Sequence, residues 1–320
     1  MFRYILKRLL WLIPIVIVVA ITIFTIMFFV PGDPTSTLIG TSATEAQRQE
    51  LLESLGLTDP YFVQLGRFLY NLFIKFDLGN SYIYGSSVST ELMNRLPITA
   101  RIAVICCVLQ AAIGIPIGVN AAVHQNSLID RITIVIAMIG QALPQFWVGL
   151  MLVILFSLRL NILPSYGVST WQGYILPCTA IIIGGFANIA RQTRSQMLEV
   201  IRSDFIVTAR AKGIPERTIR YRYALPNALI PVITGIGTQF GRALGGTVVI
   251  ETLFSIPGVG MYLVDAISQR DYPVVRGGVV VLAILFSLIV LLTDISYAVI
   301  DPRIKAQYEG KGKRRAKKDA

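Results

Sequence analysis

The connection between two long apolar runs reads RSDFIVTARAKGIPERTIRYRYALPNALI, from Arg202 to Ile230. It carries five arginines and one lysine, whereas the runs on either side are strongly apolar. An alanine-rich segment leads to Gly213, Pro215 follows it, and Pro226 comes eleven residues later. A plain linker needs little more than polarity, so this pattern predicts a shaped element.

The pattern fits two short helices joined by a tight corner. The residues TARAK favour a helix, and Gly213 can end that helix with a left-handed cap. Pro215 suits the first turn of a second helix, with Glu216 near its positive end. Leu225 and Pro226 then turn the chain back toward an apolar run. We therefore expect a helix–turn–helix elbow that lies beneath a bilayer.

The chain around the elbow has the composition of a membrane protein. Of its 320 residues 54% are hydrophobic and only 15% are charged, while soluble domains carry roughly a quarter charged residues. The net charge of +11 lies between and beyond the apolar runs rather than on one folded surface. Membrane topology explains this charge, so we expect a lipid bilayer and no nucleic acid as partners.

Six segments have the roughly 20 apolar residues that a helix needs to cross the hydrocarbon core. The first follows the basic start MFRYILKRLL, is too long for the apolar h-region of a typical signal peptide, and is followed by no small-x-small cleavage site. It is interpreted as a retained signal-anchor helix. We expect an all-α protein with six membrane-spanning helices, at residues 9–30, 99–122, 131–158, 176–196, 226–250 and 277–300.

The distribution of lysine and arginine predicts the orientation of these helices. Three basic residues lie in the first eight positions, eight lie in 191–222, and eight lie in 303–318. Six spans put these regions on one side, and the positive-inside rule makes that side the cytoplasm. We expect a multi-pass protein of the cytoplasmic membrane with both termini in the cytoplasm.

The same boundaries divide the chain into an N-terminal helix at 1–30, an extracytoplasmic segment at 31–98 and a basic tail at 301–320. Between them lies a five-helix core, residues 99–300, with its cytoplasmic loop at 197–225. In the outer segment Thr44 and Gln47 resemble a capping box, and Gly56 is a plausible helix stop. The amphipathic YFVQLGRFLYNLFIKF that follows Pro60 packs on the first span or contacts a partner.

Small residues are periodic in the fifth apolar run. Gly237, Gly241 and Gly245 lie four apart and remove side chains from one helix face. Such a face lets another backbone approach closely, so these glycines are predicted helix-packing positions.

Polar residues within the apolar runs are candidates for a substrate path, because they are costly in lipid unless they face water or a partner. Gln141, Gln239 and Arg242 are the candidates. Arg242 has an alternative structural interpretation, in which it pairs with Glu251 or Asp294 to hold the helices together.

Catalytic and metal-binding patterns are not found. Cys106, Cys107 and Cys178 lie in apolar stretches without ligand spacing, and His124 is the one histidine. The sequence holds no G-x-x-x-x-G-K-[ST] nucleotide loop and no paired-carboxylate or Ser/His/Asp arrangement. We expect neither an enzyme nor a cofactor bound by this chain.

The elbow resembles the cytoplasmic EAA loop of ABC importer permeases, whose pattern is E-A-A-x3-G-x9-I-x-L-P. Aligned on the glycine, the matching residues are Ala209, Gly213, Leu225 and Pro226. Three positions of the pattern differ in this chain. Val207 replaces the glutamate, Thr208 replaces the first alanine and Tyr223 replaces the isoleucine. Any contact that the family makes through the glutamate must here rest on other residues, such as Asp204 or Arg210.

DFIVTARAKG resembles the D-Y-V-R-T-A-R-A-K-G version of this loop, which is typical of the dipeptide/oligopeptide/nickel permease family. Further fingerprints of that family follow in order over about 300 residues and favour its B-type subunit. They are PGDP at 31–34, DLGNSY at 77–82, RLPIT at 95–99, PQFWVGL at 144–150, GGTVVIETLFSIPGVG at 245–260, RDYPVVRG at 270–277 and DISYAVIDPRIK at 294–305.

The resemblance implies the type I ABC importer permease fold and a set of partners. These are a second, related permease, two ATPase subunits that bind ATP and Mg²⁺, and an extracytoplasmic solute-binding protein. The elbow at about 204–223 would be the coupling helix that docks on one ATPase. Its expected contact residues are Asp204, Thr208, Ala209, Arg210, Ala211, Lys212, Gly213, Pro215 and Glu216.

The resemblance favours a permease subunit of an importer for dipeptides or oligopeptides. Nickel or a nickel chelate is the alternative cargo within the family. A channel or secondary carrier that works without ATP is an alternative of a different class, opposed by the detailed pattern of the elbow and by the shortage of carboxylates in the apolar runs.

Overall fold

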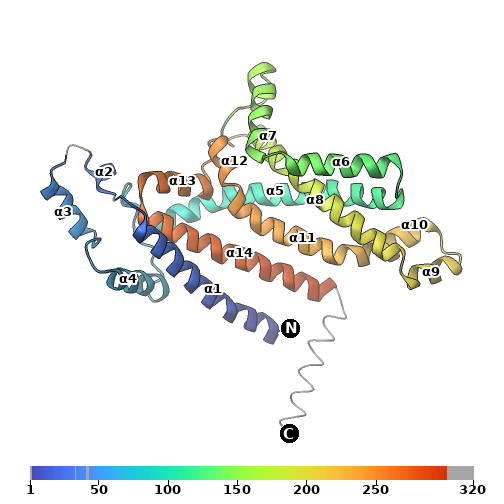
Figure 1. Ribbon diagram of the computed structural model, residues 1–320, viewed down its shortest axis with the longest axis horizontal. Coiled ribbons are helices and arrows are strands. Elements are labelled where there is room, and N and C mark those ends of the chain that lie inside the picture. The colour runs from blue at the N-terminus through green and yellow to red at the C-terminus, as the bar shows by residue number, and fades with distance from the viewer. Residues whose placement is uncertain (1, 33, 41–42, 301–320) are drawn as a thin grey trace, which may run out of the picture. The chain divides into compact units, whose positions relative to one another are not determined.

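The structure is a computed structural model, and it describes residues 2–32, 34–40 and 43–300. In these residues the regular elements are helices, and the strand pairing is limited to one isolated bridge between Asn80 and Ser87. Long apolar segments in lipid must satisfy their backbone groups internally, which a helix does within one segment. The predicted all-α class is confirmed (Figure 1).

Four helices are long and apolar enough to span a membrane. They are α1 (Phe2–Phe29), α5 (Val88–Val123), α8 (Ile175–Ile201), which continues the turn η2 (Trp171–Tyr174), and α14 (Tyr272–Ile300). They coincide with the first, second, fourth and sixth predicted spans. The apolar runs were therefore sufficient to find these helices.

The predicted span at 131–158 is not one straight helix. It is divided into α6 (Leu128–Ala142) and α7 (Gln145–Leu152), which continues as the π-helix η1 (Val153–Arg159), and the two parts are bent by 94°. Leu143 and Pro144 form the break, with extended ψ angles of 125° and 132°. Proline has no N–H for the helix and disfavours helical geometry in the residue before it, so the break lies here.

The predicted span at 226–250 corresponds to α11 (Leu225–Gly246) and the short α12 (Val248–Leu253). In the described part of the chain, the helices that meet the length and hydropathy of a span number four, or five if the bent pair counts as one. The structure is therefore consistent with six spans, and that number stays a prediction.

Tertiary contacts divide the chain into two compact units. The first comprises Met1–Arg8, Arg101–Ile256 and Leu288–Ala320, and the second comprises Leu9–Ala100 and Pro257–Ser287. In the first unit α6, α7 and α11 pack against α8, and α6, α8 and α11 run side by side (Figure 1). Gly114 of α5 also lies against α8, where a Cβ atom would come within 2.7 Å of the Phe186 carbonyl oxygen. Close approach of two backbones thus builds the centre of this unit.

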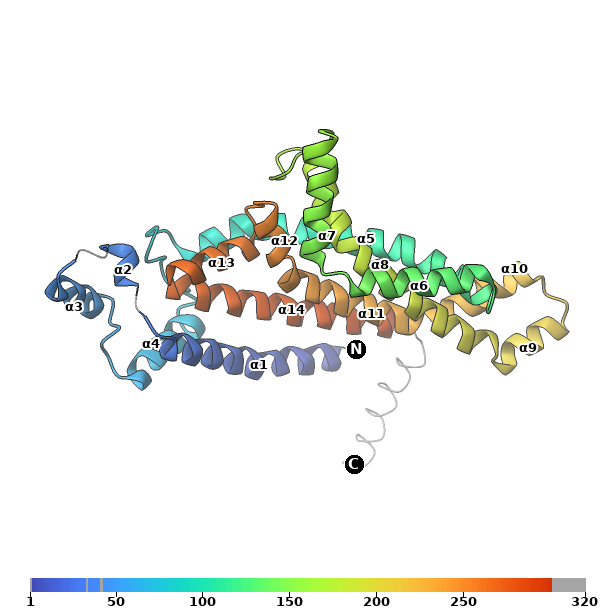
Figure 2. The same cartoon turned by 45° about the horizontal axis from the view of Figure 1, so that its top comes forward.

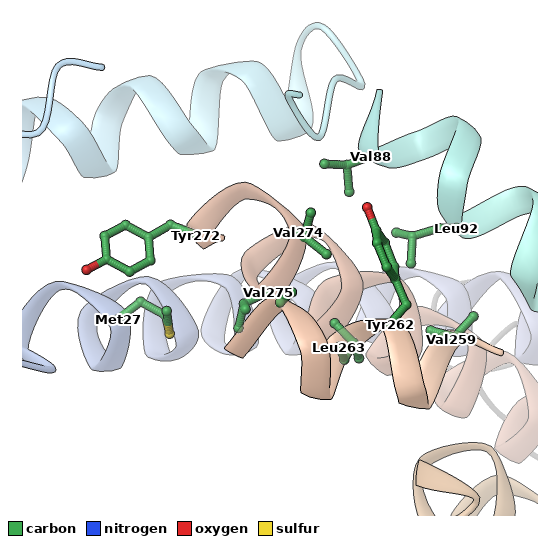
Figure 3. Close-up of a cluster of buried hydrophobic side chains, with 10 residues drawn as sticks. Met27, Val88, Leu92, Val259, Tyr262, Leu263, Tyr272, Val274 and Val275 are labelled. Carbon is green, nitrogen blue, oxygen red and sulfur yellow. The ribbon is translucent and has the colours of Figure 1, made fainter. Parts of the chain in front are cut away.

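The second unit is organised around a cluster of buried hydrophobic side chains (Figure 3). Its residues come from α1, the start of α5, α13 (Val259–Gln269) and the start of α14. They are Met27, Val88, Leu92, Val259, Tyr262, Leu263, Ala266, Tyr272, Val274 and Val275. This cluster joins segments that are far apart in the sequence.

The segment after α1 contains the short α2 (Thr35–Leu38), then α3 (Glu45–Ser54) and α4 (Tyr61–Phe73). The capping box of Thr44 and Gln47 is present, and Gly56 has a φ angle of +65° just beyond α3, so both local predictions are confirmed. Tyr61 of α4 contacts the rings of Phe24 and Phe28 and shares a 2.7 Å hydrogen bond with Thr25. Of the two alternatives for this helix, the structure shows packing on α1.

Candidate coupling elbow and polar cavity

The basic connection forms an elbow beyond the end of α8 (Figure 2). Its first arm is α9 (Asp204–Ala211), and its second arm is α10 (Glu216–Thr218), which continues as the π-helix η3 (Ile219–Ala224) into α11. Ser203 precedes α9 in extended geometry, and Asp204 supplies a negative charge in the first turn. That charge is favourable at the positive end of a helix.

Gly213 forms the corner between the arms. Its φ angle is +73°, its N–H donates to the Arg210 carbonyl oxygen at 2.9 Å, and the Ile214 N–H donates to the Ala209 carbonyl oxygen at 3.3 Å. These two bonds make a Schellman motif, in which orphan carbonyls at a helix end are satisfied through a left-handed residue. The predicted left-handed cap at Gly213 is confirmed.

One face of the elbow is turned into the first unit. Ile206, Ala209 and Ile219 are buried in a hydrophobic cluster that includes Val119 of α5 and Met197 of α8. Ala209 matches the alanine of the family pattern, and its side chain packs within the chain. Its contribution to the elbow is therefore to fix the position of α9.

The opposite face is exposed. Of the predicted contact residues, those with exposed side chains or backbone are Asp204, Thr208, Arg210, Ala211, Lys212, Gly213, Pro215 and Glu216. Two hydrophobic side chains of α9 that sequence reasoning did not select are exposed as well: Phe205 and Val207 have exposed fractions of 46% and 55%. An apolar residue that stays exposed in a basic loop is the signal that could have identified them.

An ion pair joins the two arms across the corner. The Arg210 Nε–H donates to the Glu216 Oε1 atom at 2.7 Å, and this hydrogen bond holds the pKa of Glu216 below its ordinary value. A lowered carboxyl pKa means that the link is present at neutral pH and is lost as the pH falls through that lowered value. Both side chains are exposed, so the pair contributes little to global stability. The pair instead links α9 to α10 and so helps to hold the two arms of the elbow together.

A second feature of the first unit is a polar cavity of about 240 Å³. It is enclosed by parts of α5, α7, α8, α11 and the residue before α12. The lining residues are Cys106, Cys107, Gln110, Gln145, Ile181, Gln239, Phe240, Ala243 and Thr247. None of these carries a charge, and apolar side chains stand beside the amides and the hydroxyl. The cavity therefore suits a neutral group with polar and apolar parts.

A chain of amide hydrogen bonds runs along this cavity. Arg191 donates to the Asn188 Oδ1 atom at 3.3 Å, and the Asn188 amide donates to the Gln239 Oε1 atom at 3.1 Å. The Gln239 amide donates to the Gln110 Oε1 atom at 3.1 Å, and Gln110 donates to the Ile181 carbonyl oxygen at 3.1 Å. Hydrogen-bond chains in a low dielectric polarise one another, so this chain fixes the orientation of each amide.

One lining hydroxyl has no hydrogen-bond partner in the described part of the chain. Thr247 is 1% exposed, and its Oγ1 atom is buried and unpaired there. Buried polar groups are almost always paired, which makes this hydroxyl a candidate contact for a polar group in the cavity.

The structure separates the predicted path residues. Gln239 lines the cavity, whereas Gln141 lies exposed at the end of α6 and is not part of the lining. Arg242 is on α11, and its side chain lies outside the described residues. Gln110 and Gln145 join the lining from other helices. Only their position in three dimensions distinguishes them from other polar residues in apolar runs.

The three predicted packing glycines lie on α11. A Cβ atom on Gly237 would overlap the Thr293 side chain of α14. Gly241 is buried, and the surroundings of Gly245 lie outside the described residues. The absent side chain of Gly237 thus makes room for a neighbouring helix.

Gly185→Ala is expected to disrupt the amide chain. A Cβ atom there would overlap the Gln110 amide, whereas on Gly184 the nearest atom would be 3.4 Å away. The Gln110 amide is the flexible end of its side chain, so it can move aside, but it then loses its hydrogen bonds to Ile181 and Gln239. Buried polar groups left unpaired cost about 1–3 kcal/mol. Thermal unfolding of the purified chain should show a clear loss of stability for Gly185→Ala and little change for Gly184→Ala. In a Gln110→Ala background the added cost of Gly185→Ala should disappear, because the amide that it displaces is no longer there. A Gly185→Ala chain as stable as the parent would contradict the arrangement.

The polar cavity has few side chains that could coordinate a metal ion. Across residues 2–32, 34–40 and 43–300 no group of three or more His, Cys, Asp or Glu side chains is placed to hold a metal ion. The cavity lining offers the Cys106 and Cys107 thiols, side-chain amides and one hydroxyl. Two adjacent thiols do not make up such a group, and amides and hydroxyls are weak ligands for Ni²⁺, which prefers imidazole.

Comparison with known proteins assigns the family. Residues 114–306 match the binding-protein-dependent transport system inner membrane component family, and residues 1–103 match its N-terminal membrane component model. The chain belongs to this family and is a membrane permease component of a transport system. The family resemblance seen in the sequence motifs is confirmed.

Relatives align along nearly the whole chain. A dipeptide transport system permease protein of Alkalihalophilus pseudofirmus is 38% identical over 333 aligned positions, covering 95% of this chain and 100% of the relative. A putative peptide transport system permease protein of Brucella abortus is 40% identical, covering 94% and 98%. A glutathione transport system permease protein of Salmonella paratyphi A is 37% identical, covering 95% and 99%.

A solved structure agrees on the fold. The chain is similar to a chain of the MetNI methionine ABC transporter in an inward-facing conformation, with a TM-score of 0.56 and 20% identity. The likeness covers 66% of this chain and 96% of the other. The expected fold of an ABC importer permease is confirmed.

Proposed function

We propose that this chain is one permease half of an ATP-driven importer for short peptides. The observation that carries the proposal is the elbow, with its closed corner, its buried inner face and its exposed outer face. A membrane chain that only had to place a basic loop in the cytoplasm would need none of these features. The names of the related permeases support the same function.

The elbow docks on a cytoplasmic ATPase subunit in this proposal. Asp204 and Arg210 offer charge, and Phe205 and Val207 offer exposed apolar area. Exposed hydrophobic side chains beside charged ones are typical of surfaces that contribute binding energy in interfaces. The chemistry of ATP hydrolysis belongs to the ATPase subunits, which bind ATP and Mg²⁺. Movement of the ATPases is transmitted through the elbow to α8 and α11.

The remaining partners follow from the family. A second permease completes the path across the membrane, and an extracytoplasmic solute-binding protein delivers the cargo. Both termini of this chain lie in the cytoplasm, as the distribution of lysine and arginine indicates.

Peptides are favoured as cargo over nickel by the polar cavity. Its amide groups and the Thr247 hydroxyl can donate to and accept from a peptide group, and its lining carries no charge. The nickel importer is the second candidate, because a chelated metal would need no metal ligands from the permease.

The proposal is tested by reconstituting the permease with its ATPases, partner permease and solute-binding protein in proteoliposomes. A labelled dipeptide should accumulate only when ATP and Mg²⁺ are present on the side of the ATPases. Equal uptake without ATP would support a channel or secondary carrier instead. Accumulation of radioactive nickel, with no accumulation of any dipeptide, would support the metal importer.

A further inference from the structure

Arg276 stands apart from the other arginines in the described part of the chain. It lies on α14 in the second unit, and its exposed fraction is 8%, the lowest among them. A guanidinium stays charged in proteins, so burial cannot be relieved by loss of its proton. Buried charges are normally paired with an opposite charge, which raises the question of what pairs with Arg276.

Aromatic rings supply its known contacts. The Arg276 Cζ atom lies 4.3 Å from the centroid of the Phe24 ring, 5.4 Å from that of Tyr272 and 6.0 Å from that of Phe68. In the described residues no hydrogen bond or ion pair reaches this guanidinium, and its Nε atom is buried without a partner. Cation–π contacts are worth about 0.5–2 kcal/mol, which is less than the cost of a desolvated charge.

Arg95 in the same unit shows the complete arrangement. Its Cζ atom lies 4.4 Å from the centroid of the Tyr262 ring, and its guanidinium also pairs with Glu91 at 3.3 Å. Arg95 therefore has both an aromatic ring and a carboxylate. Arg276 has the rings and lacks the carboxylate.

A cavity of about 140 Å³ lies beside Arg276. Hydrogen-bond donors from α4 and from the loop after it also line the cavity, among them Arg67, Asn71 and Tyr82. A single water needs roughly 10–15 Å³ of such space, so the cavity has room for a small group of several atoms. It can hold one small anionic group and is too small for a whole peptide.

The carboxylates near this cavity already have partners. Asp59 pairs with Arg67 at 2.6 Å, and Asp77, which itself lines the cavity, accepts the Gly79 N–H at 2.8 Å. Asp271 is 1% exposed and accepts the Ser81 hydroxyl at 2.5 Å and the Tyr82 N–H at 3.1 Å. No ion pair joins Asp77 or Asp271 to Arg276 in the described residues.

We propose that this cavity binds a single carboxylate group, with Arg276 as its charged partner. The guanidinium can accept a carboxylate through two parallel N–H···O bonds, and the cavity places polar donors around it. The bound group would complete at Arg276 the arrangement that Arg95 makes with Glu91. This binding is independent of the transport activity proposed above, so it can be tested without cargo uptake.

The test measures thermal unfolding of the full-length chain in lipid nanodiscs, with sodium acetate or sodium chloride at equal ionic strength. Acetate should raise the Tm of the parent chain by about 2–4 °C, because a ligand that binds the folded state stabilises it. Arg276→Met should abolish this rise while leaving the Tm without acetate unchanged or higher, because it removes an unpaired buried charge. Arg95→Met is the matched control and should keep the response to acetate.

Three results would overturn the proposal. They are a parent chain that acetate does not stabilise, an Arg276→Met chain that acetate still stabilises, and an Arg276→Met chain that is clearly destabilised without acetate. The last would show that the cation–π contacts are the whole role of Arg276. If Arg276→Met does not fold, Arg276→Lys keeps the charge without the planar fork and should weaken the response to acetate. An unchanged response in Arg276→Lys would also overturn the proposal.

Further arms of the experiment identify the source of the carboxylate. Stabilisation by glycylglycine but not by glycylglycine amide would indicate the C-terminus of a peptide. Stabilisation by acetate but by neither peptide would indicate a carboxylate that enters from another source. Inorganic phosphate that stabilises the chain as well as acetate would overturn the carboxylate and indicate a phosphate headgroup.

Discussion

Gly213→Val is expected to reduce ATP-driven uptake strongly while leaving the chain folded in the membrane. Gly213 has a φ angle of +73°, and no atom lies within 4 Å of a Cβ placed on it, so the penalty comes from the backbone rather than from a clash. A left-handed conformation costs an L-residue about 1–2 kcal/mol, and more for a β-branched side chain. About 2 kcal/mol corresponds to roughly a thirtyfold loss of the closed corner.

The measurement is peptide uptake and substrate-stimulated ATP hydrolysis in the reconstituted importer, with binding of the solute-binding protein as a second readout. Gly213→Asn is the matched control, because asparagine tolerates the left-handed region and should retain most activity. Normal uptake and stimulated hydrolysis by Gly213→Val would count against a coupling role for the elbow. Loss of solute-binding protein contact as well would point to general misfolding.

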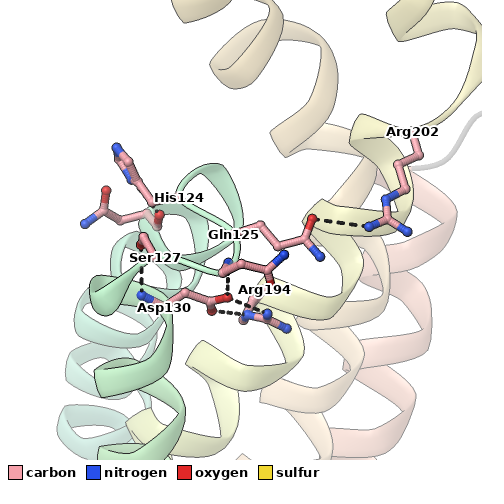
Figure 4. Close-up of polar contacts among 8 residues, drawn as sticks. His124, Gln125, Ser127, Asp130, Arg194 and Arg202 are labelled. Atoms are coloured by element: carbon pink, nitrogen blue, oxygen red, sulfur yellow. Dashed lines mark hydrogen bonds and ion pairs between the residues drawn. The ribbon is translucent and has the colours of Figure 1, made fainter.

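Asp130→Asn is expected to destabilise the chain by about 3 kcal/mol. Asp130 is 2% exposed and forms two hydrogen bonds with the Arg194 guanidinium, of which the Nη2–Oδ2 bond measures 2.7 Å (Figure 4). It also accepts the Asn126 N–H at 2.9 Å, just before α6. Removal of one member of a buried ion pair typically costs 3–5 kcal/mol, because the other charge is left without compensation. The Arg194 side chain is 20% exposed, so water compensates it in part and the lower end of this range applies.

Thermal or denaturant unfolding of the purified chain measures this effect. Arg202→Gln is the control, since Arg202 is exposed and forms a single hydrogen bond with Gln125 at 3.2 Å (Figure 4). Its change should stay within about 0.5 kcal/mol. A similarly small change for Asp130→Asn would show that the ion pair between α6 and α8 makes no net contribution to the free energy of unfolding.

The features that the sequence predicted well depend on neighbouring residues. The capping box of Thr44 and Gln47 and the left-handed corner at Gly213 are decided by residues within one turn. The long apolar helices follow from hydropathy alone, because a helix in lipid satisfies its own backbone. Such features need no knowledge of the tertiary structure.

The features that the sequence did not predict depend on distant residues. Gln110, Gln145 and Gln239 come together from three helices, and no local pattern marks them as neighbours. The chemistry of proline explains the break at Leu143 and Pro144, but the 94° bend between α6 and α7 depends on how each part packs. The sequence also could not predict that Arg276 lacks an ion-pair partner in the described residues, because this depends on where the carboxylates of distant segments lie in three dimensions.

The corner at Gly213 has a consequence for the order of folding. Its bonds join Ala209 to Ile214, Arg210 to Gly213 and Arg210 to Glu216, so none spans more than six residues. Contacts this short lose little chain entropy when they close, and they form faster than contacts between distant helices. The elbow can therefore take its bend while α8 and α11 are still unpaired. Packing of Ile206 and Ala209 would then fix only the orientation of the already formed elbow relative to α5 and α8.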